Sequence, residues 1–253
     1  MPNTVVIDCF PEHVTRYRRG YAVVAVDVVR ATTTAITAVA AGYRCFPAPT
    51  LAAALARAGS LDDVLLAGEQ RGLKPPGFDL DNSPTEVLAL GEIGRPIVLL
   101  SSSGTALCYE ASQCEAGFLA CLRNYTAVVS DLAGRFERVA IVGAGSRGEF
   151  REEDQLCCAW VAAGLMALGY TPQNSVTLDI IRHWGKRPAD AWLGNKSAAY
   201  LKNSGQLADL EFILTHVADL DACFTLSDGE VTMAAAPLPS TTADSLRKGM
   251  YGA

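Results

Sequence analysis

Residues 22–34 read Ala-Val-Val-Ala-Val-Asp-Val-Val-Arg-Ala-Thr-Thr-Thr, and this segment decides the class of fold. Its first five residues are apolar without alternation, which is the pattern of a strand buried on both faces of a parallel sheet. A helical pattern follows at residues 33–41. A buried strand followed directly by a helix is the repeating unit of α/β proteins.

The same alternation of a short apolar run and a helical pattern occurs three more times along the chain. The further runs are residues 64–67, 96–100 and 138–142, and the helical patterns after them are residues 83–90, 105–112 and 152–168. We therefore expect a three-layer α/β/α fold with a mostly parallel sheet, which is mixed, if at all, at its edge. One helix start is marked by Ser83 as N-cap, Pro84 at the first helical position and Glu86, which closes a capping box.

The rest of the chain carries weaker patterns. Residues 175–181 have the pattern of a strand, whereas residues 189–202 and 207–215 have the pattern of helices. No repeat or linker divides the sequence, so residues 1–237 are expected to form a single α/β domain. Residues 238–253 are expected to form a loosely ordered C-terminal tail.

Composition argues against several classes of function. Of the 253 residues, 50% are hydrophobic and 19% are charged, as in an ordinary globular protein. The formal net charge is −6, from 21 basic and 27 acidic residues, and the sequence holds no extended basic cluster. We therefore expect no nucleic-acid partner and no membrane partner.

The eight cysteines form no C-x-x-C pair, which favours a reduced, cytoplasmic protein. The sequence leaves open whether the protein is a homodimer.

Polar residues gather where four of the predicted strands end. They are Asp27 and Arg30 after the first run, Gly68 and Glu69 after the second, Ser101 to Thr105 after the third, and Gly143 to Asp154 after the fourth. Because ligands bind at the carboxyl ends of parallel strands, we expect these four ends to line one cleft. The hydroxyls of residues 32–34 begin the first helix, and such a helix start beside an arginine suits an anion.

Residues 68–84 are predicted to form a long loop that is dense in glycine, proline and charged side chains. Long ordered loops in compact domains are usually functional. Rigid glycine and proline positions surround Glu69, Lys74, Asp79 and Asn82, so these four side chains are candidates for a site.

Five carboxylates are candidates for a metal site: Asp27, Glu69, Asp79, Glu153 and Asp154. If they converge, two of them about 4 Å apart would repel by roughly 4 kcal/mol at an effective dielectric constant of about 20. A cation must then lie among them, and oxygen ligands without histidine or cysteine favour Mg²⁺ over Zn²⁺. Mg²⁺ beside a guanidinium indicates phosphoryl chemistry, in which both neutralise the phosphate oxygens.

One motif favours a different function. Gly143, Gly145 and Gly148 follow an apolar run with the G-x-G-x-x-G spacing of dinucleotide-binding proteins. The acidic residue expected about 20 residues later is missing, and the following helix opens with acidic residues that would repel a pyrophosphate. An NAD-dependent oxidoreductase is therefore the less favoured alternative.

Taken together, these segments resemble the motifs of the 2-phosphosulfolactate phosphatase family of coenzyme M biosynthesis. Residues 27–34 resemble the family's D-V-x-R-A-T/S-T motif, and residues 68–84, which read G-E-x-x-G-L-K-x-x-G-F-D-x-x-N-S-P, resemble its longest motif. Residues 103–105 stand where the family has N-G-T, and Gly145-Ser146 followed by Glu153-Asp154 matches its fourth motif. The resemblance extends to about residue 237.

The resemblance implies a Mg²⁺-dependent phosphatase that hydrolyses 2-phospho-3-sulfolactate, a small anionic phosphate ester, to 3-sulfolactate and phosphate. It implies catalytic roles for Asp27, Arg30, Glu69 and Asp79, with Asp27 as either a metal ligand or a nucleophile. The implied metal ligands are Asp27, Glu69, Asp79, Glu153 and Asp154. The implied substrate ligands are Thr32, Thr33, Lys74, Asn82, Ser83, Ser103, Gly104, Thr105, Ser146 and Arg147.

Three positions depart from the family's pattern. Ser103 replaces the usual asparagine, Ala106 stands where a basic residue is expected, and Asp81 replaces a glycine. A different organic phosphate is one explanation, because each lost charge-assisted hydrogen bond is worth about 1.5–3 kcal/mol. A catalytically weakened homologue that binds a small anion without hydrolysing it is a second alternative.

Overall fold

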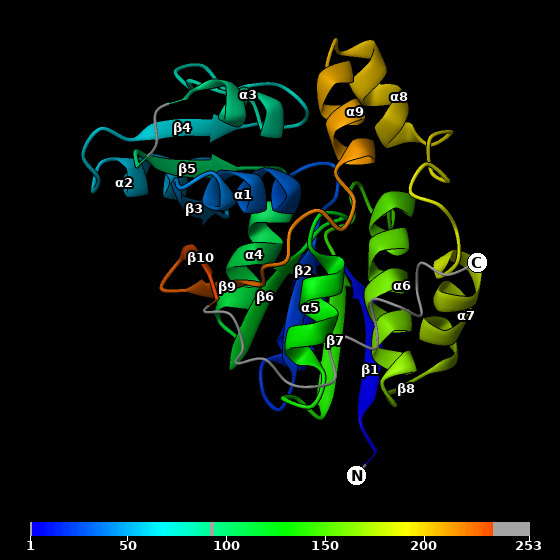
Figure 1. The fold of residues 1–253 in the computed structure, drawn as a ribbon. Helices are drawn as coiled ribbons and strands as arrows, with labels where there is room; N and C mark the ends of the chain where they lie inside the picture. Colours follow the sequence, from blue (N-terminus) through cyan, green and yellow to red (C-terminus); the bar gives the residue numbers. More distant parts are fainter. Residues whose placement is uncertain (1, 92–93, 235–253) are drawn as a thin grey trace.

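The computed structural model describes residues 2–91 and 94–234, and these residues form one ten-stranded sheet (Figure 1). In order across the sheet, the strands are β4 (Leu65–Gly68), β5 (Pro96–Leu100), β3 (Arg44–Ala48), β10 (Glu230–Met233), β9 (Phe224–Ser227), β6 (Ala116–Ala120), β2 (Ala22–Val26), β7 (Arg138–Gly143), β1 (Thr4–Cys9) and β8 (Thr171–Pro172). The predicted tail, residues 238–253, lies outside the described residues, and the division of the chain into domains stays a prediction.

The sheet consists of two parallel groups of strands that are joined by an antiparallel hairpin. Strands β4, β5 and β3 pair in parallel, as do β6, β2, β7, β1 and β8. Between the groups, β10 runs antiparallel to β3 and β9 runs antiparallel to β6. The expected α/β class and mostly parallel sheet are confirmed, but the antiparallel strands lie inside the sheet and not at its edge. Asp228 and Gly229, with φ of 52° and 75°, form the tight turn that lets these two short strands pair.

Helices cover both faces of the sheet. They are η1, a 3₁₀ helix (Pro11–Tyr17), α1 (Ala31–Ala40), α2 (Leu51–Ala58), α3 (Pro84–Ala89), α4 (Gly104–Ser112), α5 (Tyr125–Leu132), α6 (Glu152–Ala167), α7 (Ser175–Trp184), α8 (Lys196–Asn203) and α9 (Leu207–Thr215). Strand β2 shows the two faces, because Val24 and Val26 pack in a core with α5, α6 and α7, whereas Val23 and Ala25 pack in a core with η1, α1 and α4. All four side chains are fully buried, as the unbroken apolar run predicts.

Most of the predicted helices form, with one clear error. Residues 175–181, predicted as a strand, belong to α7, because Asn174 caps that helix by accepting a hydrogen bond from Thr177 N at 2.8 Å. The helix predicted at residues 189–202 begins only at Lys196, whereas the helix predicted at residues 207–215 is confirmed as α9.

The start of α3 agrees with its prediction in part. Ser83 Oγ accepts a hydrogen bond from Glu86 N at 3.1 Å, and Pro84 is the first helical residue. The carboxylate of Glu86 accepts instead from the backbone N–H of Asp81 at 2.8 Å, so the capping box is not closed. The preceding loop, rather than the cap, therefore uses this carboxylate.

In the described part of the chain no helix is long and apolar enough to cross a membrane.

Candidate functional site

A cavity of about 440 Å³ lies at the carboxyl ends of the parallel strands. Its walls come from the segments that follow β2, β4, β5 and β7, and from the N-terminal parts of α6 and α8. The structure thus brings together the four strand ends that the sequence analysis expected to line one cleft. These elements contribute both carboxylates and guanidinium groups to the lining of the cavity.

Many of the predicted site residues line this cavity, and others do not. Those in the lining are Asp27, Arg30, Glu69, Asn82, Ser103, Ser146, Arg147, Glu153 and Asp154. Those outside the lining are Thr32, Thr33, Lys74, Asp79, Ser83, Gly104 and Thr105. The residues outside it fall into two classes, those that shape the backbone around the cavity and those that lie in the long loop.

Asp27 directly follows strand β2, and its carboxylate is buried. The N-terminus of α4 packs against it so closely that a Cβ at Gly104 would lie 1.9 Å from Asp27 Oδ2. The pKa of the Asp27 carboxyl is raised to about 7, mainly by burial and also by the negative charges of Glu69 and Glu153, against the opposing effect of Arg30.

Two more buried carboxylates come from the first turn of α6. Asp154 Oδ1 accepts a hydrogen bond from Val28 N at 2.8 Å, and Glu153 Oε2 accepts one from Asn195 Nδ2 at 2.6 Å. Burial raises the pKa of both groups, and for Asp154 the charges of Asp27 and Glu153 raise it well above the ordinary value. Three acidic side chains that repel one another in a buried site are stabilised by a proton or a cation.

The predicted cluster of five carboxylates does not form. Among the residues that the structure describes, no three histidine, cysteine, aspartate or glutamate side chains lie close enough to hold a metal ion by themselves. Asp79 is exposed, and its Oδ2 accepts a hydrogen bond from Leu66 N at 2.8 Å on the edge strand β4. Mg²⁺ usually takes only one or two protein carboxylates and keeps several waters, so one or two of Asp27, Glu153 and Asp154 fit such an ion in their chemistry.

Asn82 adds a further oxygen to this environment. The side chain is 2% exposed and lines the cavity, and its Oδ1 atom has no hydrogen-bond partner within the described residues. A buried amide oxygen without a partner costs free energy unless a ligand or water satisfies it. This atom is therefore suited to a cation, a water or a hydroxyl donor in the cavity.

Glu69 holds two loops together at the end of β4. Its Oε1 accepts from Ser102 N at 2.6 Å, and its Oε2 accepts from Ser102 Oγ at 2.9 Å and from Gly72 N at 2.6 Å. The preceding residue has to be glycine, because a Cβ on Gly68 would lie 2.3 Å from Leu100 O. The carboxylate of Glu69 thus fixes the position of the loop after β5 relative to the loop after β4.

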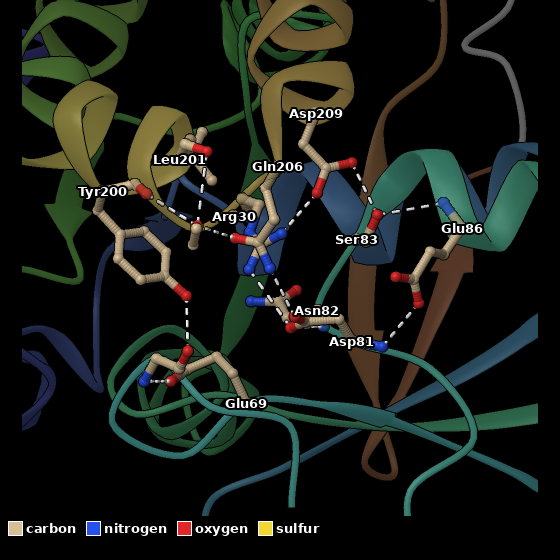
Figure 2. Close-up of polar contacts among 12 residues, drawn as sticks. Arg30, Glu69, Asp81, Asn82, Ser83, Glu86, Tyr200, Leu201, Gln206 and Asp209 are labelled. Atoms are coloured by element: carbon tan, nitrogen blue, oxygen red, sulfur yellow. Dashed lines mark hydrogen bonds and ion pairs between the residues drawn. The ribbon is translucent and has the colours of Figure 1, made fainter.

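Arg30 lines the cavity but is already paired with two carboxylates, as Figure 2 shows. Its Nη1 donates to Asp209 Oδ2 at 2.5 Å, and its Nη2 donates to Asp81 Oδ1 at 3.3 Å. Asp209 Oδ1 accepts in turn from Ser83 Oγ at 2.7 Å and from Thr85 Oγ1 at 2.6 Å. The guanidinium is therefore fixed in orientation by two carboxylates, which the sequence analysis did not predict.

The predicted hydroxyl ligands outside the lining bond to the protein itself. Thr32 Oγ1 accepts from Asp27 N at 2.9 Å, Thr33 Oγ1 donates to Val28 O at 2.8 Å, and Thr105 Oγ1 accepts from Ser101 N at 2.9 Å. These bonds shape the turns that present Asp27 and Ser101. In the long loop, Lys74 Nζ donates to Asp79 O at 3.3 Å, so this predicted pair lies together but outside the cavity lining.

Several cavity residues were missed by the sequence analysis. Arg71, Arg151, Lys196, Ser197 and Tyr200 all contribute to the lining. Tyr200 lies on α8, and its hydroxyl donates to Gly72 O at 2.7 Å (Figure 2). A local sequence pattern can predict that helix, but nothing local shows that it packs over loops more than a hundred residues earlier in the chain.

The G-x-G-x-x-G motif has a packing role in this structure. A Cβ at Gly143 would lie 2.4 Å from the ring of Phe150, and a Cβ at Gly145 would lie 2.7 Å from the ring of Phe10. These two glycines therefore admit aromatic rings close to the backbone. The helix after the motif presents Glu153 and Asp154 to the cavity, where they would repel a pyrophosphate.

Comparison with known proteins gives a consistent result. Residues 9–223 match the family described as 2-phosphosulpholactate phosphatase. A "Probable 2-phosphosulfolactate phosphatase" of Deinococcus radiodurans is 36% identical over 192 residues, which are 74% of this chain and 80% of that protein. Proteins of the same name are 36% identical in Thermus thermophilus, over 75% of this chain and 81% of the relative, and 30% identical in Symbiobacterium thermophilum, over 85% and 94%. Because the match covers most of the sequence and includes every segment around the cavity, the chain belongs to the 2-phosphosulpholactate phosphatase family.

Proposed function

We propose that this chain is a Mg²⁺-dependent phosphatase that hydrolyses 2-phospho-3-sulfolactate, or a similar small anionic phosphomonoester, to 3-sulfolactate and phosphate. The observation that carries the proposal is the group of buried carboxylates Asp27, Glu153 and Asp154 in one cavity with the buried Arg30. Family membership and the names of the relatives support the same activity.

One or two of Asp27, Glu153 and Asp154 would hold the metal ion together with waters, and the unpartnered amide oxygen of Asn82 is a further donor in the same cavity. When bound, Mg²⁺ supplies positive charge for the phosphate oxygens and lowers the pKa of a bound water. The repulsion among the three carboxylates supports this assignment, since a divalent cation would relieve it.

Arg30 is proposed to bind the phosphate oxygens. A guanidinium has five N–H donors, the bonds to Asp209 and Asp81 use two of them, and Arg30 lines the cavity. Because Asp209 fixes the guanidinium plane, these donors need little reorganisation when the substrate binds. Arg30 would then stabilise the charge on the transferring phosphoryl group together with the metal.

Asp27 has two proposed roles that experiment can separate. As a nucleophile, its carboxylate oxygen would form a bond to phosphorus while the ester bond to the substrate breaks, and water would then hydrolyse the aspartyl phosphate. As a metal ligand, it would leave the attack on phosphorus to a water. Trapping a labelled phosphoenzyme that is lost in Asp27→Asn supports the first role, and turnover without any labelled intermediate supports the second.

The experiment that tests the proposal is a measurement of phosphate release from 2-phospho-3-sulfolactate, 2-phospholactate and phosphoglycerate, with Mg²⁺ and with EDTA. We expect release that depends on Mg²⁺ and is fastest with the sulfonate. Binding of the substrate without release would instead support the alternative of a catalytically weakened, anion-binding homologue. If the wild-type protein neither binds nor hydrolyses any of the three esters, the proposal is wrong.

Two matched substitutions distinguish the carboxylates. Asp27→Asn should lower kcat by about 10²–10³-fold, because it removes a charge that would contact the metal or the phosphate. Asp79→Asn should change kcat by less than about 5-fold, since Asp79 lies outside the cavity lining and bonds to a strand backbone. Steady-state kinetics of both variants check this. A large loss in Asp79→Asn alone would restore the catalytic role that the sequence analysis assigned to Asp79.

The cytoplasmic location, the homodimer and a place in coenzyme M biosynthesis stay predictions from the sequence. Sedimentation of the purified protein tests for the homodimer, and the substrate preference in the phosphate-release assay tests the place in coenzyme M biosynthesis.

A further inference from the structure

Several of the charged residues that line the cavity are paired inside the protein. Arg30 pairs with Asp209 and Asp81, and Glu69 accepts from the backbone N–H groups of Ser102 and Gly72. The three buried acids are the groups assigned to the metal in the preceding section. The remaining charged groups in the lining are cationic side chains on the loops after β4 and β7 and on α8.

Glu149 neutralises part of that remaining charge. Its Oε1 accepts from Lys196 Nζ at 2.6 Å and its Oε2 accepts from Arg151 Nη1 at 2.9 Å. Arg71 and Arg147 differ from these two cations, because neither guanidinium has an ion pair or hydrogen bond anywhere in residues 2–91 and 94–234. Both side chains are exposed at the cavity. The cavity therefore presents two unpaired guanidinium groups.

Arg71 and Arg147 also occupy the same position in two matching turns. In one turn Gln70 and Leu73 exchange backbone hydrogen bonds of 2.8 and 3.2 Å, and in the other Ser146 and Glu149 exchange bonds of 2.9 and 3.0 Å. Each turn has an Arg-Gly pair at its centre, with φ of 56° and 83° at residues 71–72 and of 52° and 75° at residues 147–148.

An arginine is not the residue that such a turn selects. Two central residues with positive φ characterise the type I′ turn, in which Asn, Asp or Gly is strongly preferred at the first central position. Arginine adopts this backbone region at a cost in free energy. Finding it twice, at the same turn position and in the same cavity, indicates that the guanidinium groups serve the cavity rather than the turns.

Helix α8 holds both turns against the same site. The Tyr200 hydroxyl donates to Gly72 O at 2.7 Å, and Lys196 pairs with Glu149 of the other turn. Lys196 and Tyr200 are four residues apart on α8, so they lie on the same face of the helix. Figure 2 shows Tyr200 reaching the loop that contains Glu69. One face of α8 therefore contacts both Arg-Gly turns beside the cavity.

From this arrangement we propose that Arg71 and Arg147 bind a second anionic group of the substrate, a carboxylate or a sulfonate beside the phosphate ester. The inference rests on the proposed phosphatase function and assigns the residues that select its substrate class. A planar guanidinium donates two parallel hydrogen bonds to such an oxyanion, which neither a lysine nor a hydroxyl provides. The site then favours phosphomonoesters with at least one further negative charge over neutral alkyl phosphates.

The test compares two esters that differ only in that group, 2-phospholactate and isopropyl phosphate, in which a methyl replaces the carboxylate. We expect the wild-type protein to prefer 2-phospholactate in kcat/KM. Arg71→Asn and Arg147→Asn should each lower this preference by about 10–100-fold, mainly through KM, because a charge-assisted pair is lost. 2-Phospho-3-sulfolactate, assayed in parallel, shows whether the sulfonate or the carboxylate is bound.

The substitution to asparagine guards against an effect on folding, since asparagine suits the positive φ of both turns better than arginine. Arg19→Asn is the matched control, because Arg19 is exposed, lies outside the cavity lining and carries the same charge. It should leave the preference unchanged. An equal loss for both esters in the Arg71 and Arg147 variants, or no loss for either, overturns the proposal.

A binding measurement separates this inference from the proposed function. If the wild-type protein releases phosphate from none of the esters, the phosphatase proposal fails, and calorimetry with 3-sulfolactate and inorganic phosphate then tests the arginines directly. Weaker binding of 3-sulfolactate in both variants, with phosphate binding less affected, supports the second-anion site. Unchanged binding, or no binding of 3-sulfolactate to the wild-type protein, is evidence against it.

Discussion

At the scale of single residues, Gly104 determines whether the Asp27 carboxylate can occupy its position. The backbone of this first residue of α4 touches Asp27, and an added Cβ would also lie 2.5 Å from the Cβ of Ala31. Neither neighbour can move freely, because Ala31 begins α1 and Asp27 directly follows a buried strand. Gly104 was predicted as a substrate ligand, but in the structure it is the absence of its side chain that matters.

Gly104→Ala should therefore impair both stability and activity. We expect a loss of about 1–3 kcal/mol in the free energy of unfolding from overpacking, and a fall in kcat because Asp27 is displaced. Urea denaturation and phosphate release measure the two effects. Gly194→Ala is the control, since nothing lies within 4 Å of its added Cβ, and it should change neither quantity appreciably.

At the scale of elements, α9 is tied to α1 and α3 by one buried carboxylate. Asp209 is 1% exposed and accepts hydrogen bonds from Arg30, Ser83 and Thr85, so three segments meet at this side chain. The side chains of Arg30 and Asp209 are both buried. Breaking a buried ion pair costs far more free energy than the pair itself contributes to stability.

Asp209→Ala should destabilise the protein strongly. The substitution leaves the buried Arg30 with only the longer contact to Asp81, and a buried charge deprived of its main partner costs about 3–5 kcal/mol. Equilibrium unfolding in urea measures this. Glu211→Ala on the same helix is exposed and should have little effect, and an equally small effect of Asp209→Ala would show that the pair is not important for folding.

The same elements show how far the sequence can predict this structure. The β-branched runs of β2, β5 and β7 and the helices after them were predicted nearly to the residue, because burial on both faces leaves an unmistakable apolar pattern. Strand β3, Arg44–Ala48, contains a proline, and β6, Ala116–Ala120, is rich in alanine and glycine, so neither has a local strand signal. The partner of Arg30 is 179 residues away, a distance that no local pattern spans.

At the scale of the whole molecule, stability against acid depends partly on Asp8, which is the last residue but one of β1. Its carboxylate accepts from Tyr17 Oη at 2.7 Å, from Cys9 N at 2.8 Å and from His13 Nδ1 at 2.8 Å. Burial alone would raise the pKa of Asp8, but these hydrogen bonds outweigh it and hold the pKa below its ordinary value. A lowered pKa means that the ionised group stabilises the fold at neutral pH and stops doing so as pH falls through the folded-state pKa.

Asp8→Asn should thus make stability less sensitive to acid. We expect the wild-type protein to be more stable than the variant at about pH 6, and the difference to shrink below about pH 4, where Asp8 binds a proton in the unfolded state before it does so in the native state. Urea unfolding of both proteins at several pH values measures this. A difference that stays constant down to about pH 3 would contradict the assignment.

The hairpin of β9 and β10 has a consequence for how the chain is made. It fills the centre of the sheet with residues 224–233, although the strands on either side of it, β3 and β6, are complete by residue 120. While the ribosome adds the intervening segment, β3 and β6 each lack their neighbour and expose a row of unpaired backbone groups that can pair with another chain. The sheet becomes continuous only when almost all the described residues have been synthesised, so we expect the nascent chain to be most prone to aggregation during this interval.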